Sequence, residues 1–124
     1  MTAIGRYIES PPFRSVISSG LAANDHDTID YRTSHDGSAK KYLPFNILTI
    51  TNFSGQQLEI EINGSIIKRC FESSVIVIEL DAIYDVRIKN VASSATDAEI
   101  EVIAEKRLTE RQLLKLIAQK MGVI

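Results

Sequence analysis

The middle of the chain alternates apolar and polar residues with a period of two. Across residues 57–63, leucine and isoleucine alternate with glutamine and glutamate. Such alternation predicts a strand with one face in a hydrophobic core and the other face in water. Asn63-Gly64 closes this segment, and a second extended run begins at Ser65. Because asparagine and glycine accept positive φ angles, the segment predicts a β-hairpin with a type I′ turn.

Other segments carry the same signal, and isoleucine occurs 18 times against nine leucines, which favours extended structure. Residues 74–80 (SVIVIEL) are apolar on both faces, which predicts a central strand covered from two sides. Five more segments have a strand pattern: residues 14–19, 28–33, 43–52, 84–89 and 98–105.

The two ends of the chain differ from the middle. Residues 1–12 contain Pro11-Pro12 without a clean period, which predicts an extended N-terminal arm. Residues 109–121 predict a helix, because Thr109 and Gln112 have the spacing of a capping box and Gly122 is placed to end it.

These elements predict an all-β fold, an antiparallel β-sandwich of jelly-roll-like type with six to eight short strands. We expect the arm at residues 1–12, the β-sandwich domain at residues 13–108 and a C-terminal amphipathic helix at residues 109–122. A length of 124 residues with 44% hydrophobic and 24% charged residues suits a single globular domain.

Composition narrows the functional classes. The formal net charge of −2 does not favour binding to nucleic acid or to an anionic membrane. No apolar run is long enough to cross a bilayer, and the N-terminal residues lack a signal-peptide core. A single cysteine rules out an intramolecular disulfide. We therefore expect neither nucleic acid nor membrane among the partners.

The small net charge hides an uneven distribution. Residues 1–42 are neutral, with five basic and five acidic residues. Residues 43–105 carry four basic and ten acidic residues, a net charge of −6, whereas residues 106–124 carry five basic residues and one acidic, a net charge of +4. The basic end can pair with the acidic middle within one chain or between two copies, which would guide orientation and association rate more than affinity.

Candidate catalytic chemistry is sparse. The polar run from Asn24 to Asp27, with Asp30 nearby, lacks the spacing of a metal site and predicts a loop ahead of a strand. His35 and Asp36 are adjacent in sequence, whereas a catalytic triad draws its members from separate elements. Asp36-Gly37 therefore predicts a turn between strands and not a catalytic site. Cys70 has no histidine nearby and predicts a buried thiol. We therefore predict no enzyme activity and no catalytic, cofactor-binding or metal-binding residues.

The helix suggests contacts between subunits. Its apolar residues cover an arc wider than about 100°, more than one docking stripe requires, so burying both flanks would need a second surface. We expect a homo-oligomer in which arm and helix contact neighbouring copies, although both could equally pack on their own domain. The candidate interaction residues are Ile4, Tyr7, Ile8, Phe13, Leu114, Ile117 and Met121.

Five strand-like segments between residues 43 and 105 are ILTITN (47–52), LEIEING (58–64), VIVIEL (75–80), VRIKN (86–90) and AEIEV (98–102). Together they resemble strands of small virion structural proteins of tailed bacteriophages. The resemblance implies a β-sandwich with a non-enzymatic role in the capsid, as a decoration or cement protein, or in the vertex or tail. It implies other virion proteins as partners and a virion location, after assembly in the host cytoplasm.

Two other classes remain open. One is a β-sandwich that binds a small ligand or a carbohydrate, which would need a concave pocket with aromatic lining. The other is a metal-dependent enzyme of cupin type, which would need about three converging histidine or carboxylate ligands. With only two histidines, both in segments that predict loops, the sequence favours this last class least.

Overall fold

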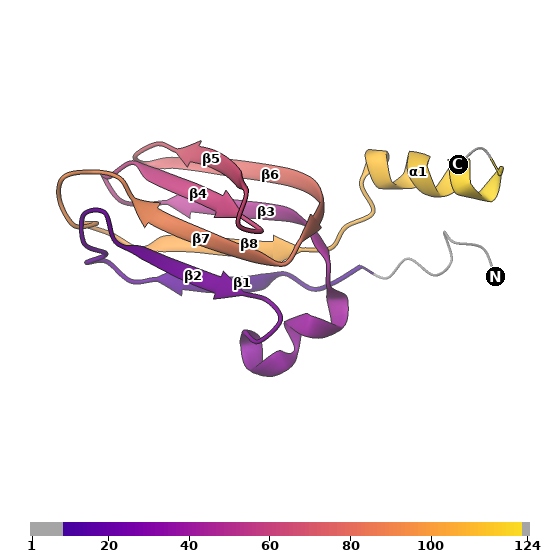
Figure 1. Cartoon of the computed structure of the whole chain (residues 1–124), viewed down its shortest axis with the longest axis horizontal. Coiled ribbons are helices and arrows are strands. Elements are labelled where there is room, and N and C mark those ends of the chain that lie inside the picture. Colours follow the sequence, from indigo (N-terminus) through magenta and orange to yellow (C-terminus); the bar gives the residue numbers. More distant parts are fainter. Residues whose placement is uncertain (1–8, 123–124) are drawn as a thin grey trace.

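The computed structural model describes residues 9–122, and over them the chain forms two antiparallel four-stranded sheets packed face to face (Figure 1). The first sheet has the order β1-β8-β3-β6. Its strands are β1 (Phe13–Ile17), β8 (Ile100–Glu105), β3 (Phe45–Asn52) and β6 (Ser74–Ile83). The second has the order β2-β7-β4-β5. Its strands are β2 (His26–Asp30), β7 (Asp85–Asn90), β4 (Leu58–Ile62) and β5 (Ile66–Cys70). The chain is therefore mostly β, as predicted.

Within residues 9–122, helical structure is confined to connections and to the C-terminal end. Two short 3₁₀ turns, η2 (His35–Gly37) and η3 (Ala39–Tyr42), join β2 to β3. The single α-helix of the described part, α1 (Glu110–Lys120), projects from one end of the sandwich (Figure 1). Within that part of the chain, no helix combines the length and apolar character needed to cross a membrane.

The predicted hairpin is confirmed. Strands β4 and β5 are antiparallel with Ile62 opposite Ile66, and the Ser65 amide donates to the Ile62 carbonyl at 3.1 Å. The turn residues Asn63 and Gly64 have φ angles of 54° and 74°, as a type I′ turn requires. The alternation then places the isoleucines of β4 in the core and its glutamates outside.

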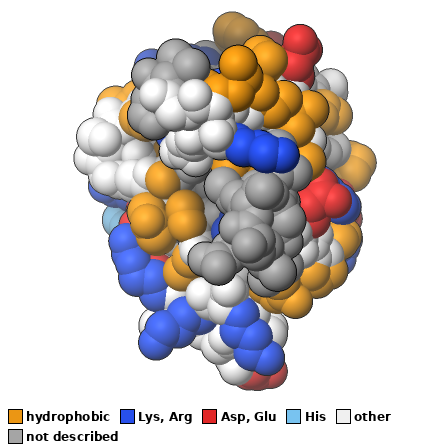
Figure 2. Space-filling view, turned by 90° about the vertical axis from the view of Figure 1, so that its right-hand side faces the viewer, with side chains coloured by type: hydrophobic (Ala, Val, Ile, Leu, Met, Phe, Trp, Pro, Cys, Tyr) orange, Lys and Arg blue, Asp and Glu red, His pale blue; other side chains and the backbone are white. Residues whose placement is uncertain are grey.

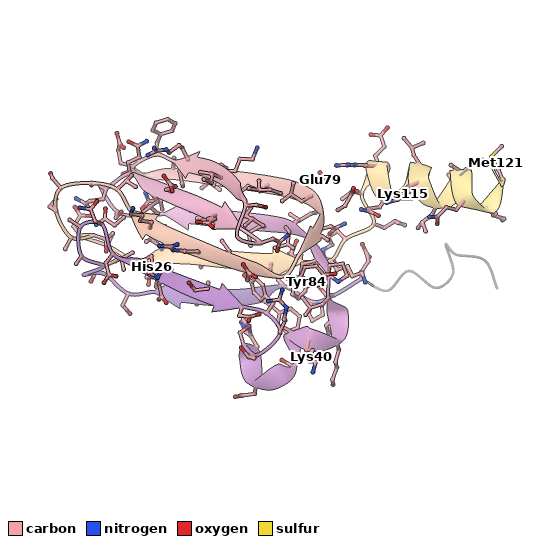
Figure 3. All side chains as sticks on the ribbon, viewed as in Figure 1. His26, Lys40, Glu79, Tyr84, Lys115 and Met121 are labelled. Carbon is pink, nitrogen blue, oxygen red and sulfur yellow. The ribbon has the colours of Figure 1, made fainter. Side chains whose placement is uncertain are left out.

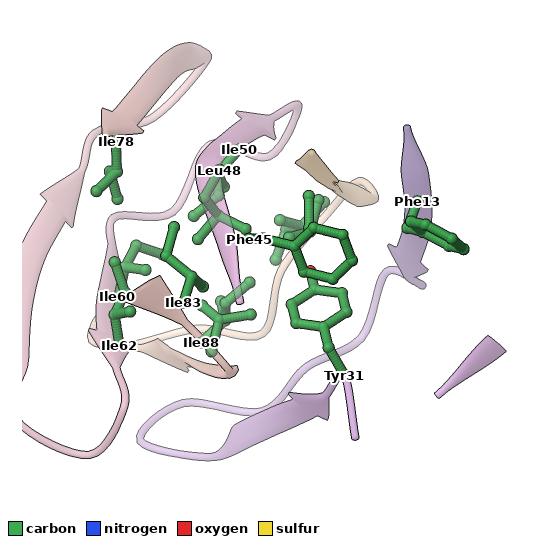
Figure 4. Packing of buried hydrophobic residues seen from close by; sticks show 14 of the residues in the cluster. Phe13, Tyr31, Phe45, Leu48, Ile50, Ile60, Ile62, Ile78, Ile83 and Ile88 are labelled. Carbon is green, nitrogen blue, oxygen red and sulfur yellow. The ribbon is translucent and has the colours of Figure 1, made fainter. Parts of the chain in front are cut away.

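The space between the sheets is filled with aliphatic side chains. Leu48, Ile50, Ile60, Ile88 and Val102 are fully buried there, and Figure 4 shows part of this cluster. The inward residues of both sheets thus form one continuous apolar core, which is the principal source of stability in a sandwich.

Aromatic rings close one end of the core. The ring of Phe45 lies 5.5 Å from that of Phe13 and 5.2 Å from that of Tyr31, between centroids (Figure 4). Tyr31 is fully buried, and its hydroxyl has no hydrogen-bond partner among the described residues. Burial raises the pKa of this phenol well above its usual value.

The prediction of a central strand at residues 74–80 is wrong. This segment belongs to β6, which lies at the edge of its sheet. Val75 and Val77 point outward and are 60% and 63% exposed, whereas Ile78 points into the core. Because the segment has apolar residues on both faces, its pattern could not distinguish a strand covered on two sides from one with an apolar outer face.

The predicted loop at residues 24–27 is shorter in the structure. Residues 26–30 form β2, an edge strand paired with β7, so the strand begins two residues before the predicted start at residue 28. The Asp25 carboxylate accepts a hydrogen bond from the His26 amide at 2.8 Å where the strand begins. Polar residues suit this strand because its outer face and its free edge are in solvent.

Candidate interaction surfaces

The segment between β8 and α1 is fixed to the sandwich by hydrogen bonds. Arg107 donates its amide to Asn46 Oδ1 at 2.9 Å and accepts from Asn46 Nδ2 at 2.6 Å. On the other side, the Lys106 amide donates to Ser10 Oγ at 2.8 Å and its carbonyl accepts from the Ser10 amide at 2.9 Å. The Leu108 amide donates to Glu9 Oε2 at 2.8 Å. These bonds set the direction in which the chain leaves the body.

Helix α1 begins and ends as its sequence predicts. The Thr109 hydroxyl accepts from the Gln112 amide at 3.2 Å, and Gly122 follows the helix with a φ of 75°. The reciprocal contact of a capping box is not made, because the Gln112 side chain turns to Asp81, with its Nε2 3.5 Å from Oδ1. Thr109 is therefore a simple N-cap.

The first turn of α1 contacts the sandwich through its polar side. Arg111 forms an ion pair with Asp81 at the end of β6, with Nη2 3.1 Å from Oδ2. Arg111 and Gln112 thus both meet one carboxylate. The remaining turns extend away from the sheets (Figures 1 and 3).

The apolar side of α1 is exposed, and no residue of the helix is buried. Leu114 is 61% exposed and Met121 is 73% exposed. At 3.6 residues per turn, the exposed apolar residues cover an arc of about 100°. We call them the apolar helix face: Leu113, Leu114, Ile117 and Met121. Seen end-on, hydrophobic and basic side chains lie side by side at this end of the molecule (Figure 2).

A second apolar surface lies on the outside of the β1-β8-β3-β6 sheet. On β6, Val77 stands opposite Thr49, which stands opposite Ile103 on β8. Two residues further along the same face, Ile47 lies between Glu79 on β6 and Glu105 on β8. We call the outward side chains of β3 and β6 the outer sheet face: Ile47, Thr49, Thr51, Val75, Val77 and Glu79.

A groove opens at one end of the outer sheet face. It has a volume of about 340 Å³, and Phe53 and Val75 contribute its apolar side chains. Its other lining residues are Thr51, Asn52, Ser73 and Ser74. The groove therefore extends an exposed apolar surface and includes one aromatic ring, which is 52% exposed.

The outside of the β2-β7-β4-β5 sheet has a different character. Glu59 pairs with Arg69 at 3.6 Å, and Glu61 pairs with Arg87 at 3.8 Å. These side chains are partly exposed, so each pair contributes at most about 1 kcal/mol. This face is a solvated ladder of alternating charge, as predicted for its glutamates.

The two histidines have different surroundings on different elements. His26 lies on β2 with its Nδ1 3.3 Å from Arg87 Nη2 (Figure 3). His35 lies in η2, where its Nε2 is 2.9 Å from the Arg14 carbonyl and its ring stacks on Tyr31. No group of three or more histidine, cysteine, aspartate or glutamate side chains within residues 9–122 is arranged to hold a metal ion.

Cys70 ends β5 and is buried. Burial raises the pKa of its thiol, and a contact with the Ser74 hydroxyl at 3.8 Å opposes this in part. A thiol with a raised pKa is mostly protonated at neutral pH and is a poor nucleophile. The structure thus places Cys70 as the sequence predicted.

The candidate interaction residues fall into three groups. Ile4, Tyr7 and Ile8 lie outside the described residues. Phe13 is buried and not available to a neighbouring subunit, because it begins β1 and packs against Phe45 in the core of its own chain. The helix residues Leu114, Ile117 and Met121 all belong to the apolar helix face. The outer sheet face was missed, although its alternating valines were visible in the sequence.

No protein-family model matches the sequence, and no curated protein matches it. Among solved structures, a de novo designed double-stranded β-helix is 12% identical with a TM-score of 0.43, covering 78% of this chain and all of the other. The Cupin_2 domain of an XRE family transcriptional regulator from Enterobacter cloacae is 13% identical with a TM-score of 0.42, covering 75% and 77%.

The Tobacco streak virus coat protein is 10% identical with a TM-score of 0.38, covering 77% of this chain and 86% of the other. Each of these similarities is to the arrangement of strands in a mostly β protein. None of the three is a bacteriophage protein.

Proposed function

We propose that this chain is a non-enzymatic structural protein that assembles with other subunits through α1. The observation that carries the proposal is the apolar helix face, which projects from the sandwich with Leu114 61% and Met121 73% exposed. Full burial of a leucine or methionine side chain contributes about 1.5–3 kcal/mol. Burying this face against another subunit would therefore yield a substantial driving force for association.

The length of α1 supports the same proposal. Isolated helices shorter than about 12–15 residues are marginal in water, and α1 has 11 residues. Among the described residues, its side-chain hydrogen bonds and ion pair with the sandwich come from its first turn, through Arg111 and Gln112. Packing against a partner would supply the tertiary contacts that such a helix lacks.

We further propose a jelly-roll connectivity and a role in the virion of a tailed bacteriophage. Eight antiparallel strands in the orders β1-β8-β3-β6 and β2-β7-β4-β5 fit a double-sheet jelly roll. That architecture occurs in viral capsid proteins, and also in lectins and cupins, so the fold alone does not choose between them. The resemblance of residues 43–105 to phage virion strands favours the capsid decoration, vertex or tail role.

The assembly role is tested by measuring the mass of the purified chain against concentration. We expect oligomers for the unchanged protein and a shift to monomer for Leu114→Asp. The control is Gln119→Asp, on the polar side of the same helix. A protein that stays monomeric at low and high salt, and that binds no particle, would refute the proposal. Capsid or tail genes beside its own gene would support the phage location, and their absence would count against it.

A ligand-binding role is the second candidate, because the groove beside Phe53 has a volume of about 340 Å³. That volume is within the range of small-molecule pockets, roughly 300–1,000 Å³. A rise in melting temperature with a sugar or nucleotide, lost in Phe53→Ala, would favour this candidate. No such rise across a panel of sugars and nucleotides would count against it.

A further inference from the structure

We propose that the partner of α1 is the outer sheet face of a second copy of this chain. The inference rests on the proposed assembly role and names the surface that receives the helix. Among the exposed apolar surfaces of the described part of the molecule, one lies on α1 and another on the outside of β3 and β6. Each surface would cover the other.

The helix is held away from its own outer sheet face. The segment before it is fixed by hydrogen bonds from Arg107 to Asn46 and from Lys106 to Ser10. The first turn is then held at the end of β6 by Asp81, which meets the polar side of α1. Folding α1 back over Val77 in the same chain would break these contacts. Docking on another copy keeps them.

The two surfaces match in length. From Leu113 to Met121 the helix rises about 12 Å, at 1.5 Å per residue. From Val75 to Glu79 the strand rises about 13 Å, at 3.3 Å per residue. An α1 helix lying along β6 would therefore cover both exposed valines. The groove beside Phe53 adjoins Val75 and could receive the side chain at one end of the helix.

The charges also match. On a helical wheel, Lys120 flanks the apolar helix face, whereas Lys115 lies on the opposite side. On the outer sheet face, Glu79 is exposed, and no ion pair is made by it within the described part of the chain. A helix docked through its apolar face would bring Lys120 to the edge of the interface, where Glu79 can meet it. The acidic Glu105 lies on the same row of the sheet.

The position of Glu79 suggests how two copies meet. Figure 3 shows Glu79 near the end of the sandwich from which α1 leaves. With Lys120, at the far end of α1, on Glu79, the near end of the docked helix lies over Val75. The subunit that gives the helix therefore lies beyond Val75, and successive copies follow one another head to tail. Such a contact forms a ring where the rotation closes and a filament where it does not.

A charge exchange tests the pairing. We expect Lys120→Glu and Glu79→Lys each to weaken self-association about threefold to tenfold at low salt, as measured by sedimentation velocity. The double variant, with both charges exchanged, should recover most of the affinity. Lys115→Glu is the matched control and should change the affinity less than twofold. Failure of the double variant to recover would overturn the pairing of Lys120 with Glu79.

A second comparison separates this inference from the proposed assembly role. Val77→Asp should disrupt association as strongly as Leu114→Asp, with circular dichroism and melting temperature showing that both variants fold. If Leu114→Asp disrupts association while Val77→Asp does not, the helix assembles on some other surface and this inference is wrong. If the unchanged protein is monomeric and both variants have the same monomeric mass, the assembly role fails as well.

Discussion

Asp81 contacts two polar side chains of the first turn of α1, with Arg111 Nη2 3.1 Å from its Oδ2 and Gln112 Nε2 3.5 Å from its Oδ1. This contact joins the end of β6 to a helix whose apolar side is exposed. It is a surface contact, and its role is to orient α1 more than to stabilise the fold.

Replacement of Asp81 by alanine should therefore loosen α1 and leave the sandwich intact. Exposed ion pairs contribute about 0–1 kcal/mol, so the free energy of unfolding should fall by less than about 1 kcal/mol. Amide hydrogen exchange in residues 110–121 should become faster, while β3 and β8 keep their protection. The control is Glu72→Ala, an exposed carboxylate. Equal exchange rates in α1 for both variants would contradict the orienting role.

Asn63 is expected to matter more than an ordinary turn residue. Its side chain donates to the Ala82 carbonyl at 2.7 Å and accepts from the Tyr84 amide at 2.8 Å, which ties the hairpin to the connection between β6 and β7. Its φ of 54° also disfavours alanine. We expect Asn63→Ala to lower the free energy of unfolding by about 2–4 kcal/mol in denaturant titrations, from lost hydrogen bonds and backbone strain.

The matched control for that variant is Asn24→Ala. Asn24 has a similar φ of 63° and donates its amide to the Asn90 carbonyl, a bond that alanine keeps. The control should therefore lose only the backbone preference, about 1–2 kcal/mol. If both variants lost the same stability, the Asn63 side-chain bonds would contribute nothing.

How much the sequence reveals depends on whether the signal is local. The hairpin was predictable because Asn63 and Gly64 select the turn and the alternation around them selects the faces. The N-cap Thr109 was predictable for the same reason. The exit direction of α1 was not, because it depends on Asn46 and Asp81, which only the tertiary structure brings to it.

The outer sheet face shows a different limit. Apolar residues on both sides of β6 predict burial on both sides, since no polar position among residues 75–78 marks an outer face. The structure assigns β6 to an edge and leaves Val75 and Val77 exposed. An apolar residue on the surface and one in the core have the same sequence signal, so an exposed face made of valines is hard to predict.

The buried hydroxyl of Tyr31 should be a source of instability. It has no hydrogen-bond partner within the described residues, and an unsatisfied buried hydroxyl costs about 1–3 kcal/mol. We expect Tyr31→Phe to raise the free energy of unfolding by about 1 kcal/mol at neutral pH, as measured by urea titration. Tyr84→Phe, at a partly exposed tyrosine, should have little effect. A loss of stability in Tyr31→Phe would indicate that the hydroxyl has a partner.

The same residue predicts instability at alkaline pH. Burial raises the pKa of Tyr31 in the folded state, whereas the unfolded chain keeps the usual value of 10.0. Above about pH 10 the unfolded state therefore loses this proton while the folded state retains it, and stability falls as pH rises, by up to about 1.4 kcal/mol per pH unit. Tyr31→Phe should make the fall in the free energy of unfolding less steep between about pH 10 and pH 11. An unchanged slope would contradict the effect of burial.

The most direct test of the account is a disulfide cross-link between two chains. One chain carries Leu114→Cys and the other carries Val77→Cys, and the two are mixed under mild oxidation. If α1 docks on the outer sheet face, a cross-linked heterodimer should form in this mixture. Its yield should be far higher than with a control chain that carries Glu61→Cys on the opposite sheet. Equal cross-linking to Val77→Cys and Glu61→Cys, or none to either, would contradict the docking of α1 on the outer sheet face.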